Sequence, residues 1–266
     1  MSHTADSART DMAVEFVGRK PRGRLCGKVR KTQVIVDEKL SEKLRRPKGT
    51  YVTVESPAAL SADRAEYKPI IREIASTLKS LTADCKSFLA VGVGNPLLTA
   101  DALGSRTVAL LKVNRGFNSA DEKELSAFSP GVSGVTGIES FDFADSIAGL
   151  VKPDCVLIID SLASAAVSRL GSAFQICDSG LVPGSGVGGG KRALNAETLK
   201  VKKVVSVGVP LVVHAETIIR DAIGERSDYE INESVRNLVV TPKDVDIVMG
   251  ECAHIIAESI NMSLGL

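Results

Sequence analysis

The sequence predicts an α/β fold of three layers, in which a mostly parallel sheet is flanked by helices and carries a small β-rich N-terminal part. Short apolar runs at 87–93, 155–159 and 203–208 are typical of buried parallel strands. Segments with helical spacing lie between the apolar runs. Because parallel neighbours need long crossover connections, repeated strand–helix units favour one sheet with helices on its faces.

The length predicts one main domain. A chain of 266 residues can bury one sizeable core, with at most a small lobe added. We expect residues 1–24, which are polar and rich in arginine, to form a mobile N-terminal arm or propeptide. Residues 25–266 are expected to form a single α/β domain.

The elements are assigned from periodicity and from turn signals. Residues 25–36 and 50–55 are β-rich and alternate in polarity, and 63–81 has helical spacing. A final helix is expected after residues 241–244, with Thr241 as its cap and Pro242 in its first turn. The elements expected between these are strand 87–93, helix 100–113, strand 125–128, helix 137–151, strand 155–159, helix 161–169, strand 173–177 and strand 203–208.

Composition excludes several classes of protein. A hydrophobic content of 44% and a net charge of +1 fit a globular protein and disfavour a strongly basic nucleic-acid binder. No apolar run is long enough to span a membrane, and the N-terminus lacks the pattern of a signal peptide. Five scattered cysteines without a C-x-x-C motif fit reduced thiols. We therefore expect a cytoplasmic protein.

Two aspartates follow apolar runs that are typical of parallel strands. Asp101 comes shortly after strand 87–93, and Asp160 ends strand 155–159. The carboxyl ends of parallel strands line the crevice in which open α/β sheets bind ligands. Two carboxyl groups in one crevice can share a proton and act as a general acid and base. The alternative is that each aspartate caps the helix after it, because Asp is a favoured N-cap residue.

Two glycine-rich segments resemble nucleotide-binding motifs but depart from them. The segment 92–97 has Leu97 where a dinucleotide fingerprint needs glycine. The segment 184–192 has Arg192 where a phosphate loop needs the hydroxyl that binds magnesium. The second segment is either a solvated surface loop or a loop whose Lys191 and Arg192 meet an acidic group.

A third glycine-rich turn, 130–139, runs into a helix. Backbone amides at a helix N-terminus can bind an anion or a developing oxyanion. We assign Glu139, at the end of this turn, to substrate binding together with Lys191 and Arg192.

Other catalytic arrangements have weaker support. The chain has no G-x-S-x-G elbow, and its single Asp178-Ser-Gly lies on an α/β background rather than on the all-β pepsin fold. His3, His214 and His254 have no metal-ligand spacing among themselves. His214, at a strand end, is either a structural histidine of the crevice edge or a functional one.

Seven blocks of sequence resemble the germination protease family of spore-forming bacteria. They occur in the family's order and span nearly the whole chain. The blocks are 9–15, 51–56, 92–104, 129–139, 152–160, 175–188 and 240–246.

The resemblance implies an atypical aspartic endopeptidase with a fold similar to that of hydrogenase-maturation proteases, and no cofactor. The two essential aspartates of the family fall on Asp101 and Asp160. Members are zymogens and homotetramers, and they degrade small acid-soluble spore proteins, which sets the expected location in the spore core or forespore. For this chain we expect no direct binding of nucleic acid and no membrane partner. Because 10–15 resembles a substrate site, the resemblance implies self-cleavage between Asp11 and Met12.

The chain also departs from the family pattern. It is shorter between about 222 and 239, and His214 stands where the family usually has aspartate. The implied similarity of fold to metal-binding maturation proteases keeps a metal role open for Asp101, Asp160 and His214, as in a maturation-type factor without this peptidase activity. A nucleotide-binding protein that uses the glycine-rich loops is the third hypothesis.

Overall fold

The computed structural model describes residues 10–16, 24–26, 28–44, 46–117, 119, 122–182, 192–223 and 231–266. These residues form a nine-stranded sheet in the order β1-β2-β3-β7-β8-β6-β4-β5, and β9 pairs with the end of β8. The strands are β1 (Arg24–Cys26), β2 (Val29–Val36), β3 (Gly49–Glu55), β4 (Ser87–Gly92), β5 (Glu124–Phe128), β6 (Cys155–Ser164), β7 (Ala173–Cys177), β8 (Lys203–His214) and β9 (Val239–Val240).

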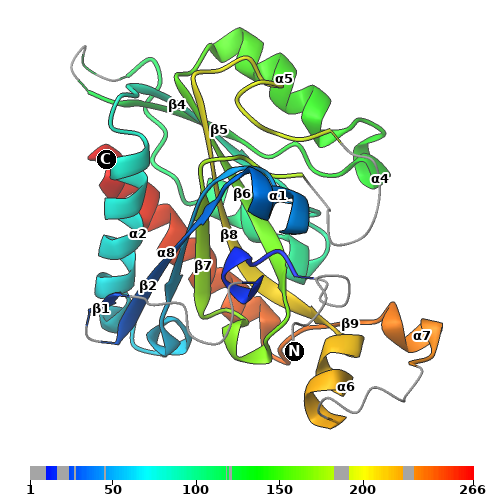
Figure 1. Ribbon diagram of the computed structural model, residues 1–266. Coiled ribbons are helices and arrows are strands. Elements are labelled where there is room, and N and C mark those ends of the chain that lie inside the picture. Colours follow the sequence, from blue (N-terminus) through cyan, green and yellow to red (C-terminus); the bar gives the residue numbers. More distant parts are fainter. Residues whose placement is uncertain are drawn as a thin grey trace.

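Helices cover both faces of this sheet, which confirms the predicted three-layer α/β fold (Figure 1). The helices are α1 (Glu38–Leu44), α2 (Lys68–Leu81), α3 (Leu103–Val108), α4 (Ser133–Thr136), α5 (Ser140–Val151), α6 (Ala215–Ile223), α7 (Glu233–Arg236) and α8 (Val245–Leu264). The first short 3-10 helix, η1, spans Ala13–Phe16.

The sheet has a parallel half and an antiparallel half. β8, β6, β4 and β5 are parallel neighbours, as the strand–helix alternation predicts. β1, β2, β3 and β7 extend the sheet by antiparallel pairing, and they include the expected N-terminal β-rich part. The chain leaves β4 for β5 on one side and then crosses to β6 on the other. Such a reversal opens a crevice at the carboxyl ends of the two strands.

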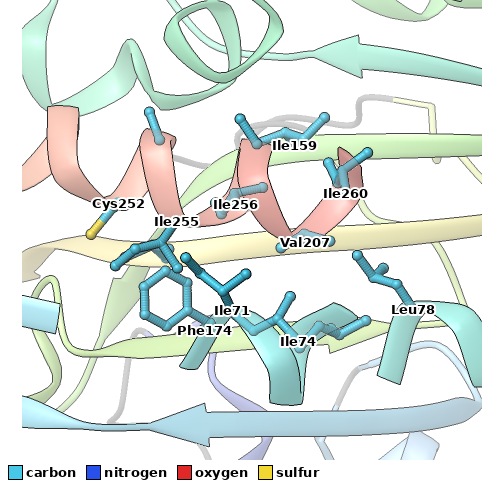
Figure 2. Packing of buried hydrophobic residues seen from close by; sticks show 14 of the residues in the cluster. Ile71, Ile74, Leu78, Ile159, Phe174, Val207, Cys252, Ile255, Ile256 and Ile260 are labelled. Atoms are coloured by element: carbon cyan, nitrogen blue, oxygen red, sulfur yellow. The ribbon is translucent and has the colours of Figure 1, made fainter. Parts of the chain in front are cut away.

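One face of the sheet is buried under α2, α3 and α8 (Figure 2). In Figure 2, side chains of α2 and α8 meet residues of β6, β7 and β8. Burial of each large aliphatic or aromatic side chain contributes about 1.5–3 kcal/mol, so this layer is the main source of stability. The labelled side chains are Ile71, Ile74, Leu78, Ile159, Phe174, Val207, Cys252, Ile255, Ile256 and Ile260.

The opposite face carries α5 over β4 and β6, and α1 over the antiparallel half. Phe141, Ala144 and Ala148 of α5 pack on these parallel strands. Leu40 and Leu44 of α1 pack with residues of β2 and β3. The main cavity of the described residues lies on this face, where Phe141 is part of its wall.

Two predicted helix ranges and one predicted helix cap were wrong. The helix expected at 161–169 is the continuation of β6, which pairs with β8 as far as Ser164, and only a 3-10 turn follows at 167–169. The helix expected at 100–113 is reduced to a 3-10 turn and α3, which ends at Val108. The last helix begins at Val245, directly after residues 241–244 as predicted, but its N-cap is Asp244 rather than Thr241.

Candidate active site

A cavity of about 990 Å³ opens on the α5 face of the sheet, at the carboxyl ends of β4 and β6. Asp101 and Asp160 both line it, so the structure brings the two predicted aspartates into one cavity. Glu139, Arg192 and His214 line the same cavity. Lys191 lies outside the described residues.

Asp101 is held by the tight turn that follows β4. Its Oδ2 accepts a hydrogen bond from the backbone N–H of Asn95, at 2.7 Å. Gly94 has a φ of +108°, and a Cβ there would lie 2.1 Å from the carbonyl oxygen of Asp101. A Cβ on Gly92 would lie 2.3 Å from the carbonyl oxygen of Gly104, in α3. These glycines therefore serve close backbone packing, and the turn carries Asp101 over the strand ends.

Asp160 lies inside β6 rather than at its end. β4 ends at Gly92, which pairs with Ile159, so Asp160 is the first residue of β6 beyond the edge of β4. Its Oδ1 accepts a hydrogen bond from the N–H of Ser161, at 2.9 Å, and the residue is 7% exposed. Because the chain continues as a strand, Asp160 does not cap a helix.

A cross-strand row leads from Asp160 into the antiparallel half of the sheet. Asp160 pairs with Gly208, Gly208 with Gln175, and Gln175 with Thr53. Directly paired residues present their side chains on the same face. Gly208 has no side chain, and the side chain of Leu162 fills the space above it, since a Cβ on Gly208 would lie 2.6 Å from Leu162.

The N-terminal segment 10–16 lies beside Ala163 of β6 and the side chain of Gln175 in β7. The N–H of Asp11 donates to the carbonyl of Ala163 at 2.8 Å, and the N–H of Ala163 donates to the Asp11 carboxylate at 2.9 Å. The side chain of Gln175 binds the segment twice. Its Nε2 donates to the carbonyl of Asp11 at 3.0 Å, and its Oε1 accepts from the N–H of Ala13 at 2.7 Å. Met12 and Ala13 are both 0% exposed.

Two arginines neutralise the carboxylates of this segment. Arg46 forms an ion pair with Asp11 at 3.2 Å and also donates to the carbonyl of Thr10. Arg169 forms an ion pair with Glu15 at 2.9 Å. Both acidic side chains are largely buried, at 13% and 6% exposed, so their charges need these partners.

Arg192 and Glu139 lie on the side of the cavity formed by α5. Arg192 pairs with Asp142 in the first turn of α5, and its guanidinium lies 4.1 Å from the ring centroid of Phe141. Glu139 is the N-cap residue of α5, without a side-chain capping bond. The glycine-rich turn before α5 thus borders the cavity, through Val132 and Ser133.

A metal site has no ligand set in the part of the chain that the structure describes. No group of three or more His, Cys, Asp or Glu side chains is placed there to hold a metal ion. Asp101, Asp160 and His214 line one cavity without forming such a group. The maturation-type hypothesis therefore gains no support from the described geometry.

Cys177 also lines the cavity, which raises the question of a cysteine nucleophile. Burial raises the pKa of its thiol, although the hydrogen bonds with Ser179 lower it. A thiolate is the nucleophilic form, so this environment disfavours a cysteine peptidase.

Replacing Cys177 by Ala should leave the peptidase rate within about threefold of the rate of the unaltered chain, because the change removes no group of the proposed chemistry. A mass-spectrometric rate assay checks this, and a loss of hundredfold or more in a folded variant would restore the thiol as a candidate.

Comparison with known proteins decides the family. A family model described as germination protease matches residues 3–233. The chain belongs to the germination protease family. This confirms the resemblance found in the sequence, and it makes the chain a protease by family membership.

Relatives named germination protease share most of their length with this family member. The protein of Caldanaerobacter subterraneus subsp. tengcongensis is 35% identical over an alignment of 269 positions, which covers 86% of this chain and 82% of the relative. The protein of Clostridium tetani is 32% identical over an alignment of 309 positions, which covers 97% of this chain and 95% of the relative. Among solved structures, the [NiFe] hydrogenase maturation protease HycI of Thermococcus kodakarensis matches with a TM-score of 0.38 and 18% identity, over 70% of this chain and 99% of that one.

Sequence reasoning missed several residues of the cavity. Gln175 is a polar residue inside the buried strand Ala173–Cys177, and that break in an apolar run was a usable signal. Arg46 and Arg169 gave no signal in the sequence, because their partners Asp11 and Glu15 lie 35 and 154 residues away.

No helix within the described residues has the length and apolar character that crossing a bilayer requires.

Proposed function

We propose that the protein is an endopeptidase in which Asp101 and Asp160 act on a water molecule, and that its first substrate is its own Asp11–Met12 bond. One observation carries the proposal. The carbonyl of Asp11 accepts a hydrogen bond from Gln175, in the cross-strand row that ends at Asp160.

Two carboxyl groups at one cavity suit this chemistry. Like charges that lie close together do not both ionise cheaply, so one aspartate keeps a proton while the other stays ionised. The ionised aspartate takes a proton from water, and the water oxygen bonds to the carbonyl carbon of Asp11. The C–N bond to Met12 then breaks. The nitrogen of Met12 receives a proton from the pair, and Asp11 keeps the new carboxyl group.

Gln175 supplies the group that stabilises the negative oxygen formed during this addition. Its Nε2 donates to the carbonyl oxygen of Asp11 at 3.0 Å, so it is the donor placed to follow this oxygen as it gains negative charge. The orientation of the amide is fixed by its second bond, in which Oε1 accepts from the N–H of Ala13. A flipped amide would lose both hydrogen bonds.

Small acid-soluble spore proteins are the proposed substrates in trans. The names of the relatives support a protease that acts in spore germination. Arg192 and Glu139, on the α5 side of the cavity, are proposed to contact the bound chain, with Lys191 as a third substrate-binding residue. From the resemblance to the germination protease family we also propose that the protein is a homotetramer in the cytoplasm of the spore. Sedimentation equilibrium measures the oligomer, and a monomer at micromolar concentration would contradict it.

Mass spectrometry of the purified full-length chain over time tests the proposed function. Self-cleavage gives a product that begins at Met12 and a released fragment that ends at Asp11. Addition of a purified small acid-soluble spore protein then tests cleavage in trans. A chain that keeps its full mass over days and leaves that protein intact would contradict the proposal.

A further inference from the structure

The short strand β9 places apolar side chains on the surface of the protein. Leu238, Val239 and Val240 are 57%, 45% and 38% exposed. Among the described strands β9 pairs with β8 alone, so its other edge carries no strand in the part of the chain that the structure describes. An open apolar edge is the kind of surface to which another polypeptide adds as a strand.

The pairing with β8 determines which backbone groups of β9 face the open edge. Val240 pairs with Val213, and the N–H of Ala215 donates to the carbonyl of Leu238 at 3.0 Å. In an antiparallel ladder, every second residue turns its N–H and C=O toward the partner strand. Val239 lies between the two bonded positions, so its N–H and C=O point away from β8. These two groups can form two hydrogen bonds with one residue of an added strand.

The helices α6 and α7 hold this edge in place. The N–H of Leu238 donates to the last turn of α7 at 3.1 Å, and the side chain of Asn232 caps the start of that helix. Arg236 of α7 lies 3.5 Å from the carboxylate of Glu216 in α6, which is largely buried. The open groups of Val239 are therefore positioned before a ligand binds, which lowers the entropy that binding costs.

The open edge borders the cavity that holds the two aspartates. Val239 lines this cavity together with Asp101 and Asp160. Along β8, Gly208 pairs with Asp160, and Val213, five residues later, pairs with β9. Five residues of a strand span roughly 16 Å. An extended polypeptide whose cut bond lies at the aspartates therefore reaches β9 with a residue about five positions away from that bond.

We propose that β9 is a docking edge for the polypeptide substrate, which adds to it as a strand about five residues from the cut bond. The inference rests on the proposed function, because it takes the substrate to be a polypeptide cut at Asp101 and Asp160. The ligand class is an extended chain that is bound through its backbone. A second copy of this chain is the other occupant of an open edge, and the position of Val239 in the cavity favours the substrate.

Peptide binding to an inactive chain tests the docking edge. The protein is the full-length chain with Asp160→Asn, which prevents cleavage, and Glu15→Gln, which removes the ion pair that its own segment forms with Arg169. The probes are synthetic peptides of the sequences 4–17 and 9–14, and only the longer one extends five residues to either side of the predicted cut bond.

Val239→Pro removes the outward N–H and no hydrogen bond to β8, since proline is tolerated on an edge strand where the N–H faces solvent. It should weaken binding of the long peptide about 3- to 10-fold, the effect of losing one hydrogen bond, as measured by calorimetry. Binding of the short peptide should stay within about twofold.

Val239→Thr is the matched control, because it keeps the N–H and a β-branched side chain. It should leave the affinity for the long peptide within about twofold of that of the chain with valine. Equal melting temperatures show that both variants are folded. Equal affinities of the proline and threonine variants for the long peptide would overturn the inference.

Hydrogen exchange of the Val239 amide gives an independent measurement. An excess of the long peptide should slow this exchange at least about fivefold, and the short peptide should leave it unchanged. Unchanged exchange with the long peptide would overturn the inference. Protection that appears without peptide and grows with protein concentration would also overturn it and assign the edge to a second copy. All these measurements use an inactive chain, so they remain readable if the unaltered chain fails to cleave itself.

Discussion

Replacing Asp160 by Asn should slow the release of residues 1–11 by about a thousandfold or more, while the chain still folds. The amide keeps the size of the carboxyl group and the hydrogen bond from the N–H of Ser161. It cannot take a proton from water, and that step is worth about 10²–10⁴-fold in rate. Asp101→Asn should have an effect of the same order, since its amide oxygen can still accept from Asn95. The intact mass of the chain, followed over time, gives both rates.

Asp145→Asn is the matched control for these variants, because Asp145 is an exposed aspartate of α5 that does not line the cavity. Its rate should equal that of the unaltered chain. Equal melting temperatures show that all the variants are folded. Self-cleavage at the normal rate in a folded Asp160→Asn chain would remove Asp160 from the mechanism.

Replacing Gln175 by Leu should lower the rate of self-cleavage by about 10²–10³-fold, the usual cost of removing one oxyanion donor. Leucine has a similar volume but cannot donate to the carbonyl of Asp11 or accept from Ala13. Loss of the hydrogen bond to the Asp11 carbonyl slows the chemical step. Loss of the hydrogen bond from the Ala13 N–H loosens the position of the segment. Hydrogen exchange of the Ala13 amide, measured in the Asp160→Asn chain, separates the two effects.

Thr53→Val is the control for Gln175, because Thr53 pairs directly with it and is also buried in the same row. The valine variant changes a polar side chain of the row and leaves both hydrogen bonds of Gln175 in place. Its rate should stay within about threefold of the unaltered chain. Similar losses in the two variants would point to a general disturbance of the sheet rather than to the hydrogen bond of Gln175.

The strands that frame the cavity could be predicted from local patterns, and its details could not. Apolar runs predicted β4 and the first half of β6, so the neighbourhood of Asp101 and Asp160 followed from the rule for parallel sheets. The segment after Asp160 has small residues with no strong strand preference. Its continuation as a strand comes from pairing with Val209–Val213 of β8, a tertiary contact that overrides propensity.

The polar contacts of the site depend on residues far apart in sequence. The two hydrogen bonds of Gln175 join residues 162 and 164 positions apart, and the pair of Arg169 with Glu15 spans 154. No periodicity reports such contacts. The family resemblance supplied the predicted Asp11–Met12 bond, and the structure adds the arginines that meet the carboxylates of this segment.

The full burial of Met12 determines the fate of the new chain end once the bond is cut. Breaking the bond turns a neutral amide into an ammonium group on Met12, which is 0% exposed, and a carboxylate on Asp11. A charge enclosed without water is far less stable than a neutral peptide group in the same place. Cleavage should therefore expel the new chain end, which makes the reaction one-way and clears the cavity for the next polypeptide. Oxidation of Met12 by peroxide, slow before cleavage and fast after it, would report that expulsion.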